Sequence, residues 1–168
     1  MKTKELRARK RATVAKLPDS LKRLPGTIIV PAQPKCIVAQ CFTDKSVFAY
    51  RDSNFDSPQW LPKTLPASCE VAVAVYELTE TTEEADMEKV GGRFTNLLQI
   101  ENLILRTEKG ENTGFTINGY TNIFFLQVDA SVFAVRADRR VGWWYVGLYR
   151  FCARHEWYAE DRFFSHAT

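Results

Sequence analysis

Residues 120–152, YTNIFFLQVDASVFAVRADRRVGWWYVGLYRFC, carry the densest strand signal in this chain of 168 residues. β-Branched and aromatic side chains run through the segment, as is typical of strands. Two short segments that contain charged residues interrupt it, Asp129-Ala130 and Asp138-Arg139-Arg140, and each predicts a turn. The expected strands are 120–128, 131–137 and 141–152.

A further hairpin is expected immediately before this segment. Asn118-Gly119 is the strongest short signal for a two-residue hairpin turn, because both residues tolerate positive φ. It predicts a strand over 114–117 that pairs with the strand beginning at Tyr120. The C-terminal third of the chain is therefore expected to form an antiparallel meander of four strands.

The preceding part of the chain also reads mainly as strands. The segments 27–31, 35–42 and 46–51 are rich in Ile, Val, Cys and Phe, and the turn at 43–45 predicts that the last two form a hairpin. Residues 70–78 are apolar on both faces, which is typical of a central strand. Three prolines between 52 and 68 indicate a long surface loop.

Three segments leave the secondary structure open or suggest helix. The acidic stretch 79–90 predicts a short helix with Thr82 as its N-cap. Residues 93–107 fit either a helix or a strand, and a strand is favoured for the second half. Residues 156–164 could add a strand or a short helix. We expect a mainly β fold, with α+β as the alternative: an antiparallel, sandwich-like body formed by one domain over residues 27–168.

The charge of the chain is divided unevenly along its length. Residues 1–23 carry nine basic and two acidic side chains, a net charge of +7, whereas the rest of the chain carries a net charge of −4. Residues 1–26 are therefore interpreted as a basic arm or short helix on a mildly acidic body. The candidate nucleic-acid-binding residues are Lys2, Lys4, Arg7, Arg9, Lys10, Arg11, Lys16, Lys22 and Arg23.

Three interpretations of this arm remain open. It could be a solvated terminus whose charge aids solubility. It could contact RNA or DNA, with Lys and Arg neutralising phosphates. It could instead contact another anion, such as an acidic protein surface or the acidic segment 70–111 of a second copy, which would make the protein a homo-oligomer.

Aromatic residues gather near the C-terminus, where residues 143–164 hold nine of the 21 Phe, Trp and Tyr side chains. In a strand, Trp143 and Tyr145 share one face, and Trp157 follows in the next segment. Exposed, these three residues would form a partner-binding patch; buried, they would fill the core. The sequence alone leaves both possibilities open.

The sequence offers little for catalysis or for a cofactor. Its four cysteines, at positions 36, 41, 69 and 152, contain no C-x-x-C pair, and there are only two histidines. Neither a phosphate-binding loop nor a dinucleotide-binding glycine motif occurs. We expect no metal, no cofactor and no catalytic residue.

The compartment is inferred from the same absences. No secretory apolar region follows the basic start, so reduced thiols in an intracellular compartment or a virion are expected. The longest uncharged apolar stretch, 141–149, is too short to cross a membrane, and no membrane partner is expected.

These observations favour a non-enzymatic assembly or structural protein whose arm contacts nucleic acid or an acidic partner. Its layout is that of small viral or phage shell proteins and of proteins docked on ribosomal RNA. The alternative is a small inhibitor or adaptor that binds a protein through the aromatic C-terminal patch.

Overall fold

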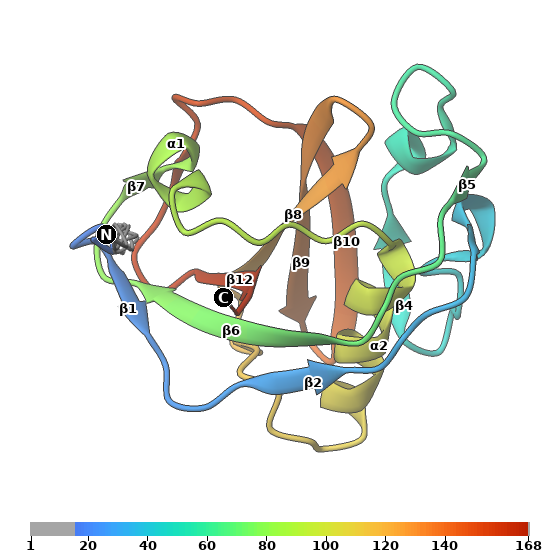
Figure 1. The fold of residues 1–168 in the computed structure, drawn as a ribbon. Coiled ribbons are helices and arrows are strands. Elements are labelled where there is room, and N and C mark those ends of the chain that lie inside the picture. The colour runs from blue at the N-terminus through green and yellow to red at the C-terminus, as the bar shows by residue number, and fades with distance from the viewer. Residues whose placement is uncertain (1–15, 168) are drawn as a thin grey trace, which may run out of the picture.

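Three long strands form the antiparallel meander at the centre of the fold, β8 (Thr121–Val128), β9 (Ser131–Arg140) and β10 (Trp143–Arg150) (Figure 1). The computed structural model describes residues 16–167. The chain turns at 129–130, as predicted, but β9 continues through the turn expected at 138–140. It reverses instead at Val141-Gly142, where φ is +49° and +86°, the backbone geometry of a hairpin that follows the strand twist.

The remaining elements are short, apart from one strand and one helix. The other strands are β1 (Leu21–Arg23), β2 (Ile28–Val30), β3 (Cys36–Ile37), β4 (Phe48–Arg51), β5 (Thr64–Leu65), β6 (Val71–Leu78), β7 (Thr82–Glu83), β11 (Glu156–Trp157) and β12 (Arg162–His166). The helices are the 3-10 turns η1 (Val38–Gln40) and η2 (Ser53–Asp56), and the α-helices α1 (Glu84–Glu88) and α2 (Leu97–Glu108).

Eight of the strands belong to one mixed sheet. Its order is β1-β6-β12-β8-β9-β10-β4, and β2 also pairs with β6. The mainly β prediction is confirmed; β6 has strand partners on both sides but stands second in the sheet order, so it is an interior strand and not the central one. The expectation of an antiparallel body is wrong at two places, because β12 pairs with β8 and β4 pairs with β10 in parallel. β7 pairs with β11 and β3 pairs with β5 in two small separate sheets.

The predicted fourth strand of the meander does not form. Residues 114–117 have no strand partner, and Asn118-Gly119 is a bend. The fully buried side chain of Asn122 takes that role, since its Oδ1 accepts from the Thr116 N–H and its Nδ2 donates to the Thr116 carbonyl, each at 2.9 Å. The Asn122 side chain thus makes the hydrogen bonds to the Thr116 backbone that a paired strand would otherwise have made.

The predicted hairpin of 35–42 with 46–51 is also wrong. The first segment stops being a strand after Ile37 and winds into η1, and β3 pairs with β5. β4 lies beside β10 instead, at the end of the large sheet.

The ambiguous segment 93–107 is mostly helix, so the favoured strand prediction for its second half is wrong. A capping box starts α2: the Asn96 side chain accepts from the Leu98 N–H at 2.8 Å, and the Gln99 side chain accepts from the Asn96 N–H at 3.2 Å. The acidic segment does contain a short helix, α1, but its N-cap is Glu83 and Thr82 belongs to β7.

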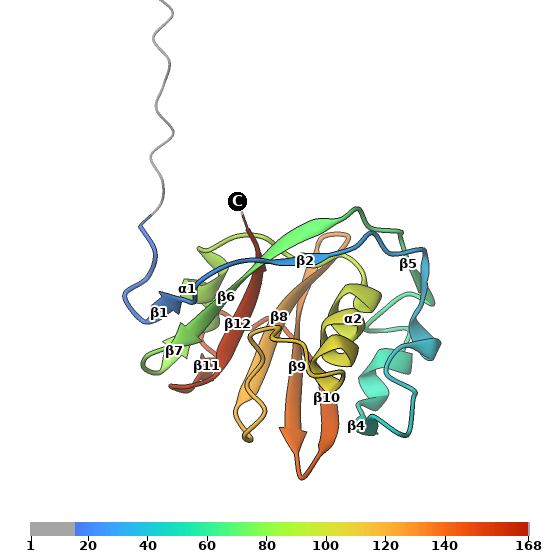
Figure 2. The ribbon, with the colours of Figure 1, turned by 90° about the horizontal axis from the view of Figure 1, so that it is seen from below.

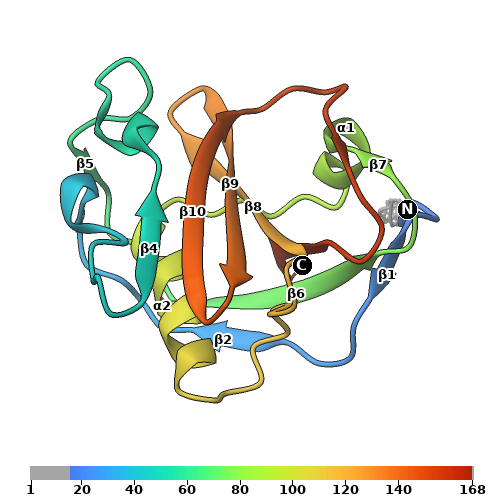
Figure 3. The same ribbon diagram turned by 180° about the vertical axis from the view of Figure 1, so that it is seen from behind.

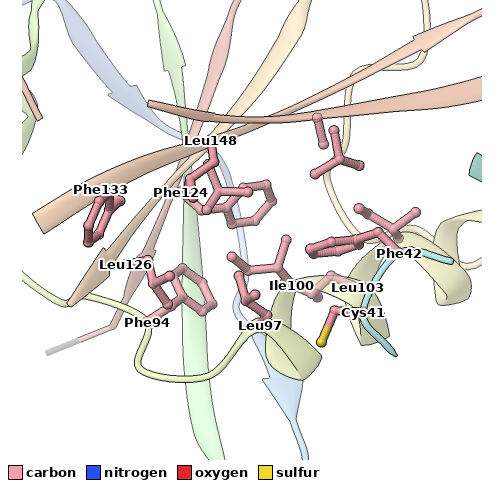
Figure 4. Packing of buried hydrophobic residues seen from close by; sticks show 14 of the residues in the cluster. Cys41, Phe42, Phe94, Leu97, Ile100, Leu103, Phe124, Leu126, Phe133 and Leu148 are labelled. Carbon is pink, nitrogen blue, oxygen red and sulfur yellow. The ribbon is translucent and has the colours of Figure 1, made fainter. Parts of the chain in front are cut away.

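Side chains from the two faces of the sheet enter two separate cores. On the inner face, α2 and the segment 36–65 cover the strands, and Leu97, Ile100 and Leu103 of α2 pack with Phe124 and Leu148 of the sheet (Figure 4). Figure 2 shows α2 lying against β9 and β10. On the outer face, a smaller core around Phe125 and Phe163 includes Met87 of α1 and Trp157.

The smaller core covers only part of the outer face. Its sheet residues come from β1, β6, β8, β12 and Ala134 of β9, whereas β10 and β4 contribute none. Figure 3 looks onto β10 and β9 from this side, with α2 behind them. Within residues 16–167, no helix has the length and apolar character needed to cross a membrane.

Candidate functional site

The predicted basic arm falls largely outside the described residues. Lys2, Lys4, Arg7, Arg9, Lys10 and Arg11 precede residue 16 and are not described. Lys16 is exposed, and its Nζ lies 3.0 Å from Asp19 Oδ1. Lys22 and Arg23 are exposed, but they belong to β1, which pairs with β6. The predicted arm of residues 1–26 therefore includes a strand of the large sheet.

The structure separates the three aromatic residues proposed for partner binding. Trp143 is 42% exposed and Tyr145 is half-buried, and both lie on the outer face of β10. Trp157 is 5% exposed, and its indole Nε1–H donates to Glu84 Oε1 at 3.1 Å. Its ring fills the smaller core, so it offers a partner almost no surface.

Tyr145 borders a hollow on the uncovered part of the outer face, and Trp143 lies two residues before it on the same face of β10. The hollow has a volume of about 260 Å³ and lies over β4, β9 and β10. We call it the Arg/Tyr surface; its residues are Tyr50, Arg136, Asp138, Arg140, Tyr145, Gly147 and Tyr149. Alternation brings these residues together, because successive strand side chains point to opposite faces and Tyr145 is paired with Asp138 and Gly147 with Arg136.

A buried carboxylate holds the two arginines of this surface. The Asp138 side chain is 2% exposed, and its Oδ2 accepts from Arg136 Nη2 at 2.5 Å and from Arg140 Nη2 at 2.8 Å. Burial lowers the pKa of Arg136, but the hydrogen bond and charge of Asp138 outweigh it, so the pKa lies above its usual value. With two arginines and one aspartate, the cluster carries a net formal charge of +1.

The other oxygen of the Asp138 carboxylate makes no hydrogen bond within the described residues. Among residues 16–167, Asp138 Oδ1 is buried and has no hydrogen-bond partner. A buried acceptor without a donor is costly, so the two arginine bonds to Oδ2 carry the stabilisation of this carboxylate.

Aromatic rings flank the arginines. Tyr50 and Tyr145 are stacked, with ring centroids 6.4 Å apart and planes 23° apart, and the Arg140 Cζ lies 5.2 Å from the Tyr145 centroid. Gly147 leaves room for Tyr149, because a Cβ at that position would lie 2.9 Å from the Tyr149 ring. Flat apolar rings beside fixed cations suit a planar ligand that carries negative charge.

A second, apolar hollow lies on the other side of the molecule. This apolar groove has a volume of about 530 Å³ and is formed by Ile37, Val38, Ala39, Phe55, Asp56, Pro58, Leu61, Pro62 and Lys63. Ile37 is 47% exposed there. The groove could take an apolar side chain or a short peptide, since it offers few polar groups for orientation.

The other buried carboxylates are used by the fold. Glu84 accepts from the Cys152 N–H at 2.7 Å as well as from Trp157, and Asp161 accepts from the Thr121 and Tyr158 N–H groups at 2.8 and 3.0 Å. Burial raises the pKa of both groups. Within the described part of the chain, no three His, Cys, Asp or Glu side chains are grouped to hold a metal ion.

Comparison of the chain with models of known families, with curated proteins and with solved structures finds no match. The site therefore stands on its own geometry. Of the residues that line this hollow, sequence reasoning pointed to Tyr145 but missed Tyr50, Arg136, Asp138 and Arg140. The signal for the β9 residues was their spacing, because positions 136, 138 and 140 share one strand face.

Proposed function

We propose that this protein is a non-enzymatic nucleic-acid-binding protein that holds single-stranded RNA or DNA on the Arg/Tyr surface. The observation that carries the proposal is the Tyr50–Tyr145 stack beside two arginines fixed by one buried aspartate. Bases stack on aromatic rings whatever their sequence, and guanidinium groups bind phosphates through paired N–H donors.

The basic N-terminal residues add the second part of the proposal. Their net charge of +7 would follow a phosphate backbone beyond the hollow, because clustered cations release counterions when they meet phosphates. The described chain starts beside β1, at the opposite end of the sheet order from β4. A strand bound by both parts would therefore run across the molecule, which suits a protein that organises nucleic acid in an assembly.

The test is binding of a fluorescent single-stranded oligonucleotide of about a dozen nucleotides, a length in the range that single-strand binding folds cover. Tyr145→Ala removes half of the stack, and a loss of about 1–3 kcal/mol in affinity is expected for one stacked base. Trp143 fluorescence provides a second readout, because its ring is exposed on the same face of β10 as Tyr145. The matched control is Tyr158→Ala, which removes a tyrosine that is 68% exposed outside the site.

Salt dependence separates the two parts of the surface. The logarithm of the binding constant should fall with the logarithm of salt concentration with a slope of about −3 to −6, at roughly 0.7 per phosphate contact. A variant that begins at Lys16 should bind with a shallower slope but keep its sensitivity to Tyr145→Ala. Salt-independent binding, or wild-type affinity in a folded Tyr145→Ala variant, would contradict the proposal.

A protein-binding adaptor is the second candidate. The apolar groove favours it, because the groove is lined by the exposed Ile37, four further apolar side chains and two prolines, and its hollow has twice the volume of the one at the Arg/Tyr surface. An Ile37→Asp variant that loses a protein partner and still binds the oligonucleotide would support this alternative for the groove.

A further inference from the structure

Two cysteines face one another inside the larger core. The Cys36 and Cys41 Sγ atoms lie 3.0 Å apart, and neither side chain is exposed. In a continuous strand, residues five apart would point to opposite faces. The strand ends at Ile37, and the 3-10 turn η1 folds the chain back so that the two sulfurs meet.

The two thiols have different surroundings. Hydrogen bonding from Cys41 lowers the pKa of Cys36, burial opposes this, and the backbone N–H groups of Leu97 and Leu98 at the start of α2 lower it further. The hydrogen bond to Cys36, followed by burial, raises the pKa of Cys41. Cys36 is therefore the thiol that more readily becomes a thiolate, the reactive form.

The loop between the cysteines is held from outside. The Arg51 side chain donates to the Cys41 carbonyl at 2.8 Å and to the Val38 carbonyl at 2.9 Å. The Phe42 N–H donates to Glu101 Oε1 at 3.0 Å. These bonds keep the sulfurs in contact without a covalent link, so oxidation needs little movement of the backbone.

We propose that Cys36 and Cys41 are a peroxide-sensitive dithiol that closes to a reversible intramolecular disulfide. The Cys36 thiolate attacks one oxygen of hydrogen peroxide, the O–O bond breaks, and the departing hydroxide takes up a proton to leave as water. The Cys41 sulfur then attacks the Cys36 sulfenic acid, the S–O bond breaks, and the hydroxide leaves with the Cys41 proton as a second water. The two thiols lose two electrons and two protons in total, and the peroxide is reduced to two waters.

The burial of the two cysteines limits which oxidants can reach them, and the disulfide would constrain part of the apolar groove. Cys36 and Cys41 are buried, whereas Cys69 and Cys152 are exposed, so we expect a water-sized peroxide to reach the buried pair and larger disulfide reagents to reach only the exposed thiols. Ile37, Val38 and Ala39, the residues that the disulfide would enclose, form one wall of the apolar groove. Oxidation would fix the shape of that wall.

The experiment uses the full chain with Cys69→Ser and Cys152→Ser, so that only the buried pair remains. After hydrogen peroxide treatment, the protein is denatured, alkylated with N-ethylmaleimide and weighed by mass spectrometry. The expected product has lost two hydrogen atoms and takes up no maleimide. After reduction with dithiothreitol and a second alkylation, it should carry two maleimide groups. In the added Cys41→Ser variant, a sulfenic acid at Cys36 should persist and react with dimedone.

Two results would overturn the proposal. One is two intact, alkylatable thiols at peroxide concentrations that fully oxidise Cys69 and Cys152 in the wild-type protein. The other is sulfinic acid as the main product, with no disulfide intermediate. Peptide mapping of the wild-type chain gives the same answer if the serine variants do not fold.

Discussion

Val141 occupies a position in the β9–β10 hairpin that its side chain does not favour. Its φ is +49°, and it is 97% exposed, so no packing compensates for the left-handed backbone. Asn adopts this conformation more easily than a β-branched residue. Val141→Asn should therefore stabilise the protein by about 1 kcal/mol and raise its melting temperature by about 2–4 °C in calorimetry.

The neighbouring glycine provides the matched control. Gly142 has a φ of +86°, and a Cβ at this position would meet no atom within 4 Å. Gly142→Ala should therefore cost about 1 kcal/mol through the backbone alone. If Val141→Asn is neutral while Gly142→Ala destabilises, the hairpin turn is not strained at Val141.

At the scale of the element, α2 shows where sequence reasoning failed and why. Leu97, Ile100, Leu103 and Ile104 are spaced for one helix face and all are buried, but alternate apolar residues in the same segment also fit a strand. The choice depends on tertiary contacts, since the cap residue Asn96 is satisfied by two loops far away in sequence. By contrast, β6, β8 and β10 were predictable because both their composition and their length are those of strands.

Asn96 joins this helix to the loops that cover the core, and it is fully buried. Its Oδ1 caps α2, and its Nδ2 donates to the Pro34 and Pro66 carbonyls at 2.8 and 2.9 Å. Asn96→Asp preserves the cap acceptor but removes both donors and places a charge against two carbonyls. We expect Asn96→Asp to lower the free energy of unfolding by about 3 kcal/mol or more. This is larger than the roughly 1 kcal/mol expected if only a helix cap were lost.

Urea unfolding monitored by circular dichroism measures this cost, with Asn54→Asp as the control. Asn54 Nδ2 donates to the Leu148 carbonyl at 3.2 Å from a less buried position, so a smaller loss is expected there. Equal losses of unfolding free energy at the two positions would mean that the hydrogen bonds from Asn96 to the two loops stabilise the fold no more than the single bond from Asn54 does.

For the whole molecule, the sequence indicated which residues share one face of each strand, but not which elements pack against that face. Alternation in β10 correctly placed Trp143 and Tyr145 on the same face. It could not show that the smaller core takes in only the first half of β9 and none of β10, which leaves the Arg/Tyr surface open. That boundary depends on loop paths, and Tyr50 joins the site only because β4 adds to the sheet in parallel, which no local pattern indicates.

Two buried carboxylates, Glu84 and Asp161, and the half-buried Glu101 give the whole molecule a characteristic dependence of stability on pH. Burial raises the pKa of Glu84, Glu101 and Asp161, so between the unfolded and folded pKa values the folded protein binds more protons. Their contribution is fully present below the unfolded pKa of about 4 and is lost as pH rises through the folded values.

Glu101→Gln tests this dependence at one position. Gln can still accept from the Phe42 N–H through its side-chain oxygen, so mainly the charge is removed. Urea unfolding between pH 4 and pH 8 should show the variant gaining stability relative to the wild type as pH rises. Glu156→Gln, at an exposed carboxylate, controls for the change in net charge. A wild-type-minus-variant difference that is constant with pH would mean that burial does not penalise the Glu101 charge.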